Sequence, residues 1–283
     1  MRIAWMAFPT TLFLGCIATP EPKAPRSGEA IPWHTGFERS SWLSEWQPRP
    51  HGSWGLENLT VEKATDGPFA KMLRASYPKG SSSPAASRQE HAPMGGGQFY
   101  GTMDRPVDHM FLRYYVRFAP GFDFVKGGKL PGLYGGTQTS GGHIPDGTNG
   151  FSTRFMWREG GQGELYAYLP SSDKYGTSLD RGSFSFTPGR WHCIEQELAL
   201  NTPGVANGVV RGWLDGKSTF QETQLMFRTV DSLHIEGVFF STFFGGSDTT
   251  WAATGDTYVD FAEFATGPTK VGCLTTTAAS LPH

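Results

Sequence analysis

Apolar and polar residues alternate along most of this chain, which is the pattern of half-buried β-strands. Residues 110–118 read M-F-L-R-Y-Y-V-R-F, and their alternation predicts a strand with one core face and one face of solvated arginines. Further strands are predicted at residues 33–36, 56–63, 70–77, 191–200, 209–214, 233–244 and 257–265, with loops at 79–87 and 171–189. No long amphipathic helical window interrupts them, so we expect an all-β protein.

The most informative pattern is a predicted hairpin. Residues 151–158 read F-S-T-R-F-M-W-R, a Gly-rich turn follows, and residues 164–168 read E-L-Y-A-Y. Side chains repeat every two residues along a strand, so each strand has one polar face. Across the turn the expected pairs are Arg158 with Glu164, Met156 with Tyr166, and Arg154 with Tyr168.

This pairing gathers a cationic and phenolic surface on one face of the hairpin. Ser152 lies on the same strand face as Arg154, and Lys126 and Lys129 arrive from the preceding segment. A guanidinium, a hydroxyl, two phenols and two ammonium groups suit an anionic ligand. We therefore expect anion binding, and chemistry on the anion, at this surface.

Composition favours two packed sheets. The chain has 283 residues, 14% aromatics, 37 Gly and 20 Pro, and no internal repeat. Many short strands joined by turns fit these values, and a jelly roll of two antiparallel sheets in a single domain is the expected architecture. We place this domain at residues 33–270, with a tail at 271–283.

The N-terminal residues predict export. Residues 1–17 combine Arg2 with a short apolar run, which is typical of a signal peptide and too short to span a bilayer. The segment L-F-L-G-C ends at Cys16 and resembles a lipoprotein cleavage site, so either a lipidated Cys16 or ordinary secretion follows. Residues 18–32 read as a linker. The expected location is secreted or attached to the bacterial outer envelope through a lipid anchor.

Charge and cysteine content exclude several classes. The net charge is −2 and no Lys/Arg-rich run occurs, so no nucleic-acid partner is expected. Cys193 and Cys273 lack further ligands at metal-binding spacing, and neither a metal nor a cofactor is expected. In an oxidising compartment the two cysteines could pair, although two separate buried thiols are the preferred interpretation. We expect a monomer.

With these residues in view, the chain resembles polysaccharide lyase family 14, which includes alginate and glucuronan lyases. The resemblance rests on the segments K-G-G-K-L-P-G-L-Y-G-G, F-S-T-R-F-M-W-R, E-L-Y-A-Y, W-H-C-I-E-Q-E-L-A-L-N-T-P-G and F-F-S-T-F-F-G-G, in this order between residues 33 and 267. It implies a β-jelly roll that cleaves a uronic-acid polymer by β-elimination. It also implies that Lys129 is the catalytic lysine, beside the pairs Ser152/Arg154 and Tyr166/Tyr168.

β-Elimination assigns a task to each residue. The proton on C5 must leave, the neighbouring carboxylate must be neutralised, and the departing O4 must receive a proton. Arg154 and Lys129 are expected to neutralise the carboxylate, with Ser152 hydrogen-bonded to it. Tyr168 is expected to act as base and acid, assisted by Tyr166.

Other residues remain candidates beside these. Lys126 is the rival catalytic lysine and a candidate substrate ligand, and His143 is an alternative base on a Gly-rich loop. Arg158 is a candidate substrate ligand that is also expected to pair with Glu164.

Two other functions remain open. Glu195 and Glu197 share a strand face, as the carboxylates of a jelly-roll glycoside hydrolase would, although solvated outer residues are the simpler interpretation. A non-catalytic carbohydrate-binding protein of the same fold would keep the aromatics and Arg154 without needing a phenol.

Overall fold

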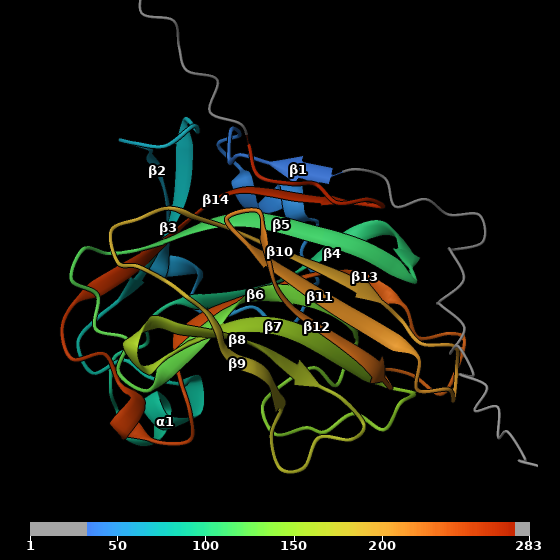
Figure 1. The fold of residues 1–283 in the computed structure, drawn as a ribbon. Helices are drawn as coiled ribbons and strands as arrows, with labels where there is room; N and C mark the ends of the chain where they lie inside the picture. Colours follow the sequence, from blue (N-terminus) through green and yellow to red (C-terminus); the bar gives the residue numbers. More distant parts are fainter. Residues whose placement is uncertain (1–32, 275–283) are drawn as a thin grey trace, which may run out of the picture.

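Two antiparallel β-sheets lie one on the other and form the body of the molecule (Figure 1). The computed structural model describes residues 33–274. The larger sheet has the strand order β12-β11-β10-β5-β14-β3-β2 with β1 paired to β14, and the smaller has the order β4-β13-β6-β7-β8-β9. This arrangement confirms the predicted all-β sandwich in a single domain.

The strands occupy most of the described chain. The larger sheet contains β1 (Trp33–Thr35), β2 (Leu59–Lys63), β3 (Lys71–Tyr77), β5 (His109–Phe118), β10 (His192–Ala199), β11 (Gly208–Leu214), β12 (Lys217–Leu225) and β14 (Thr257–Gly267). The smaller contains β4 (Gly97–Val107), β6 (Gly127–Gly136), β7 (Gly150–Arg158), β8 (Gln162–Tyr168), β9 (Thr177–Ser185) and β13 (Ile235–Phe244). Short helices connect them: α1 (Pro84–Gln89), η1 (Trp42–Trp46), η2 (Leu56–Asn58), η3 (Glu159–Gly161) and η4 (Thr249–Trp251).

Strand β5 shows how the alternating pattern builds the core. Its inward residues are all fully buried between the sheets, as predicted: Leu112, Tyr114, Val116 and Phe118. Its outer arginines are not solvated, contrary to expectation. Arg117 donates hydrogen bonds to the Asp260 carboxylate, and Arg113 donates to the backbone carbonyl of Glu263. Buried charges need such partners, which the strand pattern alone does not reveal.

The hairpin of β7 and β8 has the predicted faces but a different register. Arg154 lies opposite Tyr166 and Ser152 opposite Tyr168, whereas we expected Arg154 opposite Tyr168. The turn is formed by η3, and the last pair is Trp157 with Gly163. The pairing is therefore shifted by two residues, which keeps every side chain on its predicted face because the side-chain period is two.

A bulge in β6 places Lys129 on the same face as the hairpin residues. Lys129 pairs with Met156 and Gly132 with Arg154, so β6 has one more residue than β7 between these pairs. Lys129 and Tyr134, separated by an odd number of positions, consequently both face outward. A Cβ at Gly132 would lie 2.0 Å from the Thr153 carbonyl oxygen, so glycine permits the close approach of the two strands.

Three elements differ from the predicted loops and strands. Helix α1 begins inside the loop predicted at residues 79–87, capped by Ser83 with Pro84 in its first turn. Strand β9 lies inside the loop predicted at 171–189; it is an edge strand whose residues are mostly exposed, so it lacks an apolar alternation. The strand predicted from residue 56 begins with helix η2.

The last described residues are fastened to the outer face of the larger sheet. Cys193 on β10 forms a disulfide with Cys273, so the expectation of two separate thiols is wrong. Glu195 on the same strand accepts hydrogen bonds from the backbone N–H groups of Val271 and Gly272. The two cysteines are 80 residues apart in sequence, and only the fold brings them together.

The predicted signal peptide, the linker and Cys16 lie outside the described residues. Within residues 33–274, no helix is long and apolar enough to cross a membrane.

We predict that removing the disulfide destabilises the fold. Cys273→Ser should lower the free energy of unfolding by about 2–4 kcal/mol, because the unfolded chain regains the entropy of a long loop. Thermal unfolding with and without reductant measures this change. Reductant should lower the melting temperature of the parent and leave that of Cys273→Ser unchanged; equal melting temperatures for parent and variant would contradict the prediction.

Candidate active site

The outer face of the smaller sheet brings together four of the residues that the sequence singled out. Lys129 comes from β6, Arg154 from the middle of β7, and Tyr166 and Tyr168 from β8. The Lys129 ammonium lies 3.5 Å from the centre of the Tyr166 ring, and the Arg154 guanidinium carbon lies 5.9 Å from that of Tyr168. The two tyrosine rings meet edge to face at 5.9 Å. We call these four residues the elimination face.

Lys129 is held where its charge is unfavourable. The side chain is 8% exposed, and its ammonium group contacts the Met156 sulfur and the Tyr166 ring. Burial lowers the pKa of Lys129 well below its usual range, and repulsion from Arg154 and Arg158 lowers this pKa further. A neutral amine is a base, so this lysine is suited to accept a proton.

Arg154 is a buried cation without a carboxylate partner among the described residues. It is 2% exposed, donates one hydrogen bond to the Ser241 hydroxyl at 3.2 Å, and its Nε has no partner. Its guanidinium also lies 4.6 Å from the centre of the Phe239 ring. Burial lowers the pKa of Arg154, but an arginine remains charged at neutral pH. An uncompensated guanidinium beside two phenols attracts a carboxylate.

The two tyrosines have different surroundings. Burial raises the pKa of Tyr166 to about 12, so this residue is a neutral phenol at neutral pH. The Tyr168 hydroxyl oxygen accepts a hydrogen bond of 3.1 Å from the backbone N–H of Gly142. No described residue accepts the hydroxyl hydrogen of Tyr168, so a ligand can receive it.

At one end of this face an ion cluster neutralises the neighbouring cations. Arg158 pairs with Glu164, as predicted, and Arg181 of β9 also pairs with Glu164. Glu164 is fully buried, and its two arginine partners offset the cost of removing its charge from water. Arg158 is thus neutralised by a protein carboxylate, whereas Arg154 is left for a ligand.

Of the other candidates, Ser152 shares the outer face of β7 with Arg154, whereas Lys126 and His143 lie beyond the ends of β6. Ser152 is fully buried and donates its hydroxyl to the Thr139 carbonyl at 2.7 Å. Lys126 precedes β6 and donates to the Thr250 hydroxyl at 2.6 Å, so the rival lysine lies at the edge of the site. His143 is exposed on the loop after β6, one residue from the Gly142 contact with Tyr168.

Several residues around the elimination face were missed in the sequence. Tyr100, Tyr134 and Phe239 form a separate aromatic cluster on the outer side of β4, β6 and β13. The Ser241 hydroxyl accepts a hydrogen bond from Arg154 and donates one to the side-chain oxygen of Gln98. Alternation along β4 and β13 could have indicated these faces, but only the strand order shows that they adjoin β6 and β7.

The carboxylates of the alternative hydrolase are occupied and lie on the other sheet. Glu195 holds the C-terminal segment, and Glu197 is bonded to His109 and Arg211. Both side chains are buried, at 2% and 9% exposure, so the expectation of solvated residues is also wrong. Neither carboxylate is available to a sugar.

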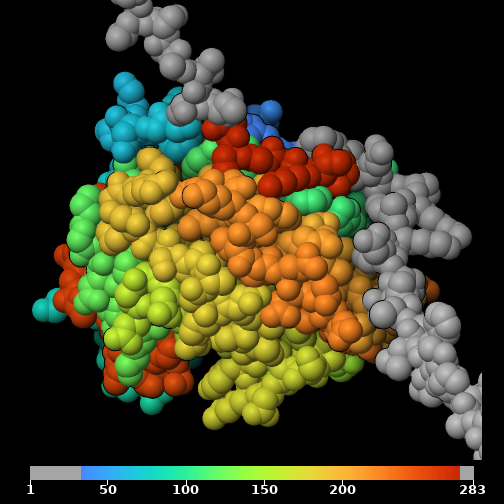
Figure 2. Space-filling model, viewed as in Figure 1, coloured from blue at the N-terminus to red at the C-terminus, as the bar shows by residue number. Residues whose placement is uncertain are grey.

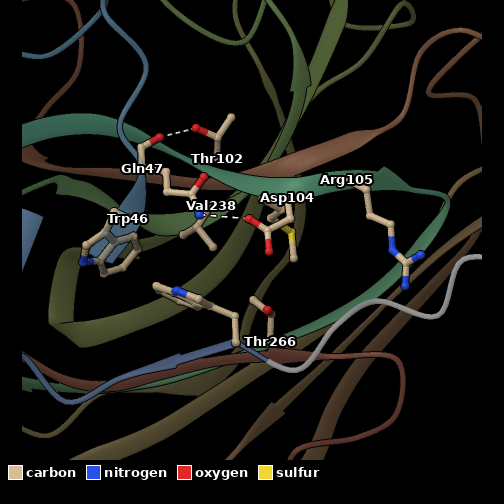
Figure 3. Close-up of a pocket in the computed structure, with 10 residues that line it drawn as sticks. Trp46, Gln47, Thr102, Asp104, Arg105, Val238 and Thr266 are labelled. Carbon is tan, nitrogen blue, oxygen red and sulfur yellow. Dashed lines mark hydrogen bonds between the residues drawn. The ribbon is translucent and has the colours of Figure 1, made fainter. Parts of the chain in front are cut away.

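A small, half-open pocket lies elsewhere (Figure 3). It measures about 110 Å³ and is lined by residues of η1, β4, β13 and β14, including Trp46, Val238 and Thr266. Gln47 donates to Asp104 across its rim at 2.9 Å. None of the four residues of the elimination face lines this cavity, which is too small for a polymer chain.

Of the four residues of the elimination face, only Tyr166 is partly exposed, and the other three are buried. Figure 2 shows the yellow segment near residues 169–185 projecting from the lower side of the molecule, with a recess between it and the orange-red segment that contains η4. In Figure 1 these two segments lie below β6, β7 and β8. Residues 33–274 contain no group of three or more His, Cys, Asp or Glu side chains that could hold a metal ion.

Comparisons with known proteins agree with this geometry. The family model described as Polysaccharide lyase 14 matches residues 65–264. A crystal structure described as the marine PL-14 alginate lyase from Aplysia kurodai is 33% identical, has a TM-score of 0.72, and is matched over 85% of this chain and 99% of its own. A search of curated protein sequences found no match.

Two more distant structures share the fold. The alginate lyase vAL-1 from Chlorella virus is 22% identical with a TM-score of 0.62, over 75% of this chain and 93% of its own. The endo-β-1,4-glucuronan lyase from the fungus Trichoderma reesei is 12% identical with a TM-score of 0.51, over 86% and 96%. The family match and the Aplysia structure carry the conclusion: the chain belongs to polysaccharide lyase family 14 and is a carbon–oxygen lyase.

Proposed function

We propose that alginate is the uronic-acid polymer that this family 14 lyase cleaves, and that the elimination face carries the reaction. The observation that carries the proposal is the unpaired Arg154 guanidinium, which lies beside the amine of Lys129 and the free hydroxyl hydrogen of Tyr168. The choice of alginate is supported by the 33% identity to the Aplysia alginate lyase, against 12% to the fungal glucuronan lyase. The alginate lyase Aly36B, 20% identical, was solved as a variant with an alginate tetrasaccharide.

Arg154 binds the carboxylate of the sugar unit that reacts. Removing the C5 proton places a second negative charge next to this carboxylate, and a preorganised cation stabilises that charge most strongly where water is excluded. Arg154 is 2% exposed and already oriented by Ser241, so little reorganisation is needed when the substrate binds.

Lys129 removes the C5 proton. We had expected Lys129 to neutralise the carboxylate, but its lowered pKa favours the neutral amine and hence the role of base. The electron pair of the C5–H bond forms the C4–C5 double bond, and the C4–O4 bond breaks. The charge gained by Lys129 appears only during the reaction, when the substrate carboxylate is nearby.

Tyr168 donates its hydroxyl proton to O4 as the bond breaks. The Gly142 N–H group remains hydrogen-bonded to the resulting phenolate oxygen. The products are a chain with a new reducing end and a chain that begins with a 4,5-unsaturated uronate. Transfer of the proton from Lys129 back to Tyr168, through solvent, restores the starting state.

Export of the protein is a further part of the proposal. The Cys193–Cys273 disulfide supports an oxidising compartment, because such bonds form and persist outside the cytosol. The leader at residues 1–17 and a lipidated Cys16 remain predictions.

Incubation with alginate and, separately, with glucuronan tests the function. Alginate should yield unsaturated product, followed by its ultraviolet absorbance, and glucuronan should yield much less. Tyr168→Phe should reduce kcat by about 10²–10⁴-fold while binding of alginate persists. Tyr258→Phe, on the larger sheet, is the matched control and should keep the parent rate. Reducing ends without unsaturation would indicate hydrolysis, and binding without turnover in the parent would indicate a binding protein; either would refute the proposal.

We also predict that Lys129→Met lowers the activity and raises the thermal stability of the protein. The substitution should abolish proton removal, with a loss of at least about 10²-fold in kcat. It should raise the melting temperature by about 2–4 °C, because the free-energy cost of holding the buried Lys129 amine deprotonated at neutral pH is removed.

The gain in stability should depend on pH. A folded-state pKa below the unfolded value means that the unfolded chain binds more protons, so the parent gains stability as pH rises between these two values. The advantage of Lys129→Met should therefore shrink toward alkaline pH. Lys217→Met, at the exposed start of β12, is the control and should show no gain. A variant less stable than the parent at neutral pH would contradict the assignment.

A further inference from the structure

The loop between β6 and β7 is tied to the proton donor. Its base is closed by hydrogen bonds from the N–H groups of Thr137 and Gln138 to the Asn149 carbonyl, at 2.8 and 3.2 Å. At its tip Gly142, with φ of +80°, points its N–H group at the Tyr168 hydroxyl oxygen. This loop is therefore not only a wall of the recess, because one of its backbone groups touches a reacting atom.

Thr139 is the point at which the sheet holds this loop. Its carbonyl accepts the Ser152 hydroxyl from β7, and its own hydroxyl is bonded to the Tyr100 hydroxyl of β4, both at 2.7 Å. Thr139 is 2% exposed, so both bonds lie in a dry environment where they are strong. Only two residues, Ser140 and Gly141, separate this anchor from Gly142, which leaves little freedom between them.

The two anchoring side chains are themselves rigid. Ser152 is fully buried and lies directly opposite Tyr168 across the β7–β8 pair. The Tyr100 ring stacks on Phe239 at 4.3 Å and meets Tyr134 edge to face at 4.9 Å. Both side chains therefore fix the position of Thr139, and with it the loop, relative to the sheet.

We propose that Ser152 and Tyr100 are positioning residues that hold Thr139 so that the Gly142 N–H group stabilises the Tyr168 phenolate formed in the elimination. This inference rests on the proposed function for its kinetic consequence, while the anchoring itself can be measured without activity. It gives Ser152 a task different from the carboxylate contact expected from the sequence. A hydrogen bond to a developing charge is worth more than one to a neutral group, so the effect falls on the chemical step.

Several other charged and titratable groups surround Tyr168, and the anchor variants alter none of them. Arg154 approaches from β7, and Tyr166 from β8 with Lys129 of β6 over its ring. Lys174 and Tyr175 pack near Gly142, and His143 follows it in the loop. Each of these groups is retained when Ser152 or Tyr100 is replaced, so a fall in the kcat of such variants without a rise in KM reports the loop contact.

The test compares Ser152→Ala and Tyr100→Phe with the parent and with Tyr115→Phe. Tyr115→Phe is the matched control: its hydroxyl also bonds a backbone group, the N–H of Leu274, but on the larger sheet. Hydrogen–deuterium exchange measures protection of residues 137–149. Steady-state kinetics on alginate measures kcat and KM.

Both anchor variants should lose protection in residues 137–149 while the rest of the chain and the melting temperature change little. Their kcat should fall by about tenfold with KM within about twofold, because one charge-assisted hydrogen bond is weakened. Tyr115→Phe should match the parent in all three measurements.

Unchanged exchange in residues 137–149 would refute the anchoring, whether or not the parent is active. Lost protection with an unchanged kcat, or with a rise in KM alone, would refute the role of the Gly142 contact. Absence of unsaturated product in the parent would instead refute the proposed function, and the exchange data would still decide the anchoring.

Discussion

Two buried basic side chains, Lys129 and Arg154, share one face of the smaller sheet without a carboxylate between them, and the active face depends on this constraint. Burial disfavours the charged form of Lys129 and repulsion from Arg154 adds to this effect, so the pKa of Lys129 is well below its usual range. Arginine keeps its proton, so the two residues divide the work: Arg154 binds the anion, and Lys129 accepts a proton. The nearby Glu164 could have neutralised them, but Arg158 and Arg181 occupy it.

The fold sustains this unfavourable arrangement through its backbone and its core. The bulge in β6 turns Lys129 outward, and the absence of a side chain at Gly132 lets β6 lie close to β7. Behind Arg154, Thr153 and Gln196 exchange two hydrogen bonds between the sheets, at 2.7 and 3.0 Å. These contacts hold the two sheets together behind the site, and they offset the cost of burying Lys129 and Arg154.

The sequence predicted which residues share the active face, but not how they are held. Alternation alone placed Arg154, Tyr166 and Tyr168 together, and this result survived a two-residue error in register because parity was conserved. The anchoring of Thr139 and the disulfide of Cys193 depend on contacts between distant segments, which no local pattern encodes. The sequence pattern did not predict the edge strand β9, because an exposed strand needs no apolar alternation.

The central claim is that Lys129 is a neutral base in the folded protein. Nuclear magnetic resonance of protein labelled with [¹³Cε]lysine, with Lys129→Met used to assign the resonance, follows the protonation of Lys129 as pH is varied. The account predicts a titration midpoint well below the ordinary lysine value of 10.5. A midpoint at or above 10.5 would show that Lys129 is a permanent cation and would contradict its role as the base.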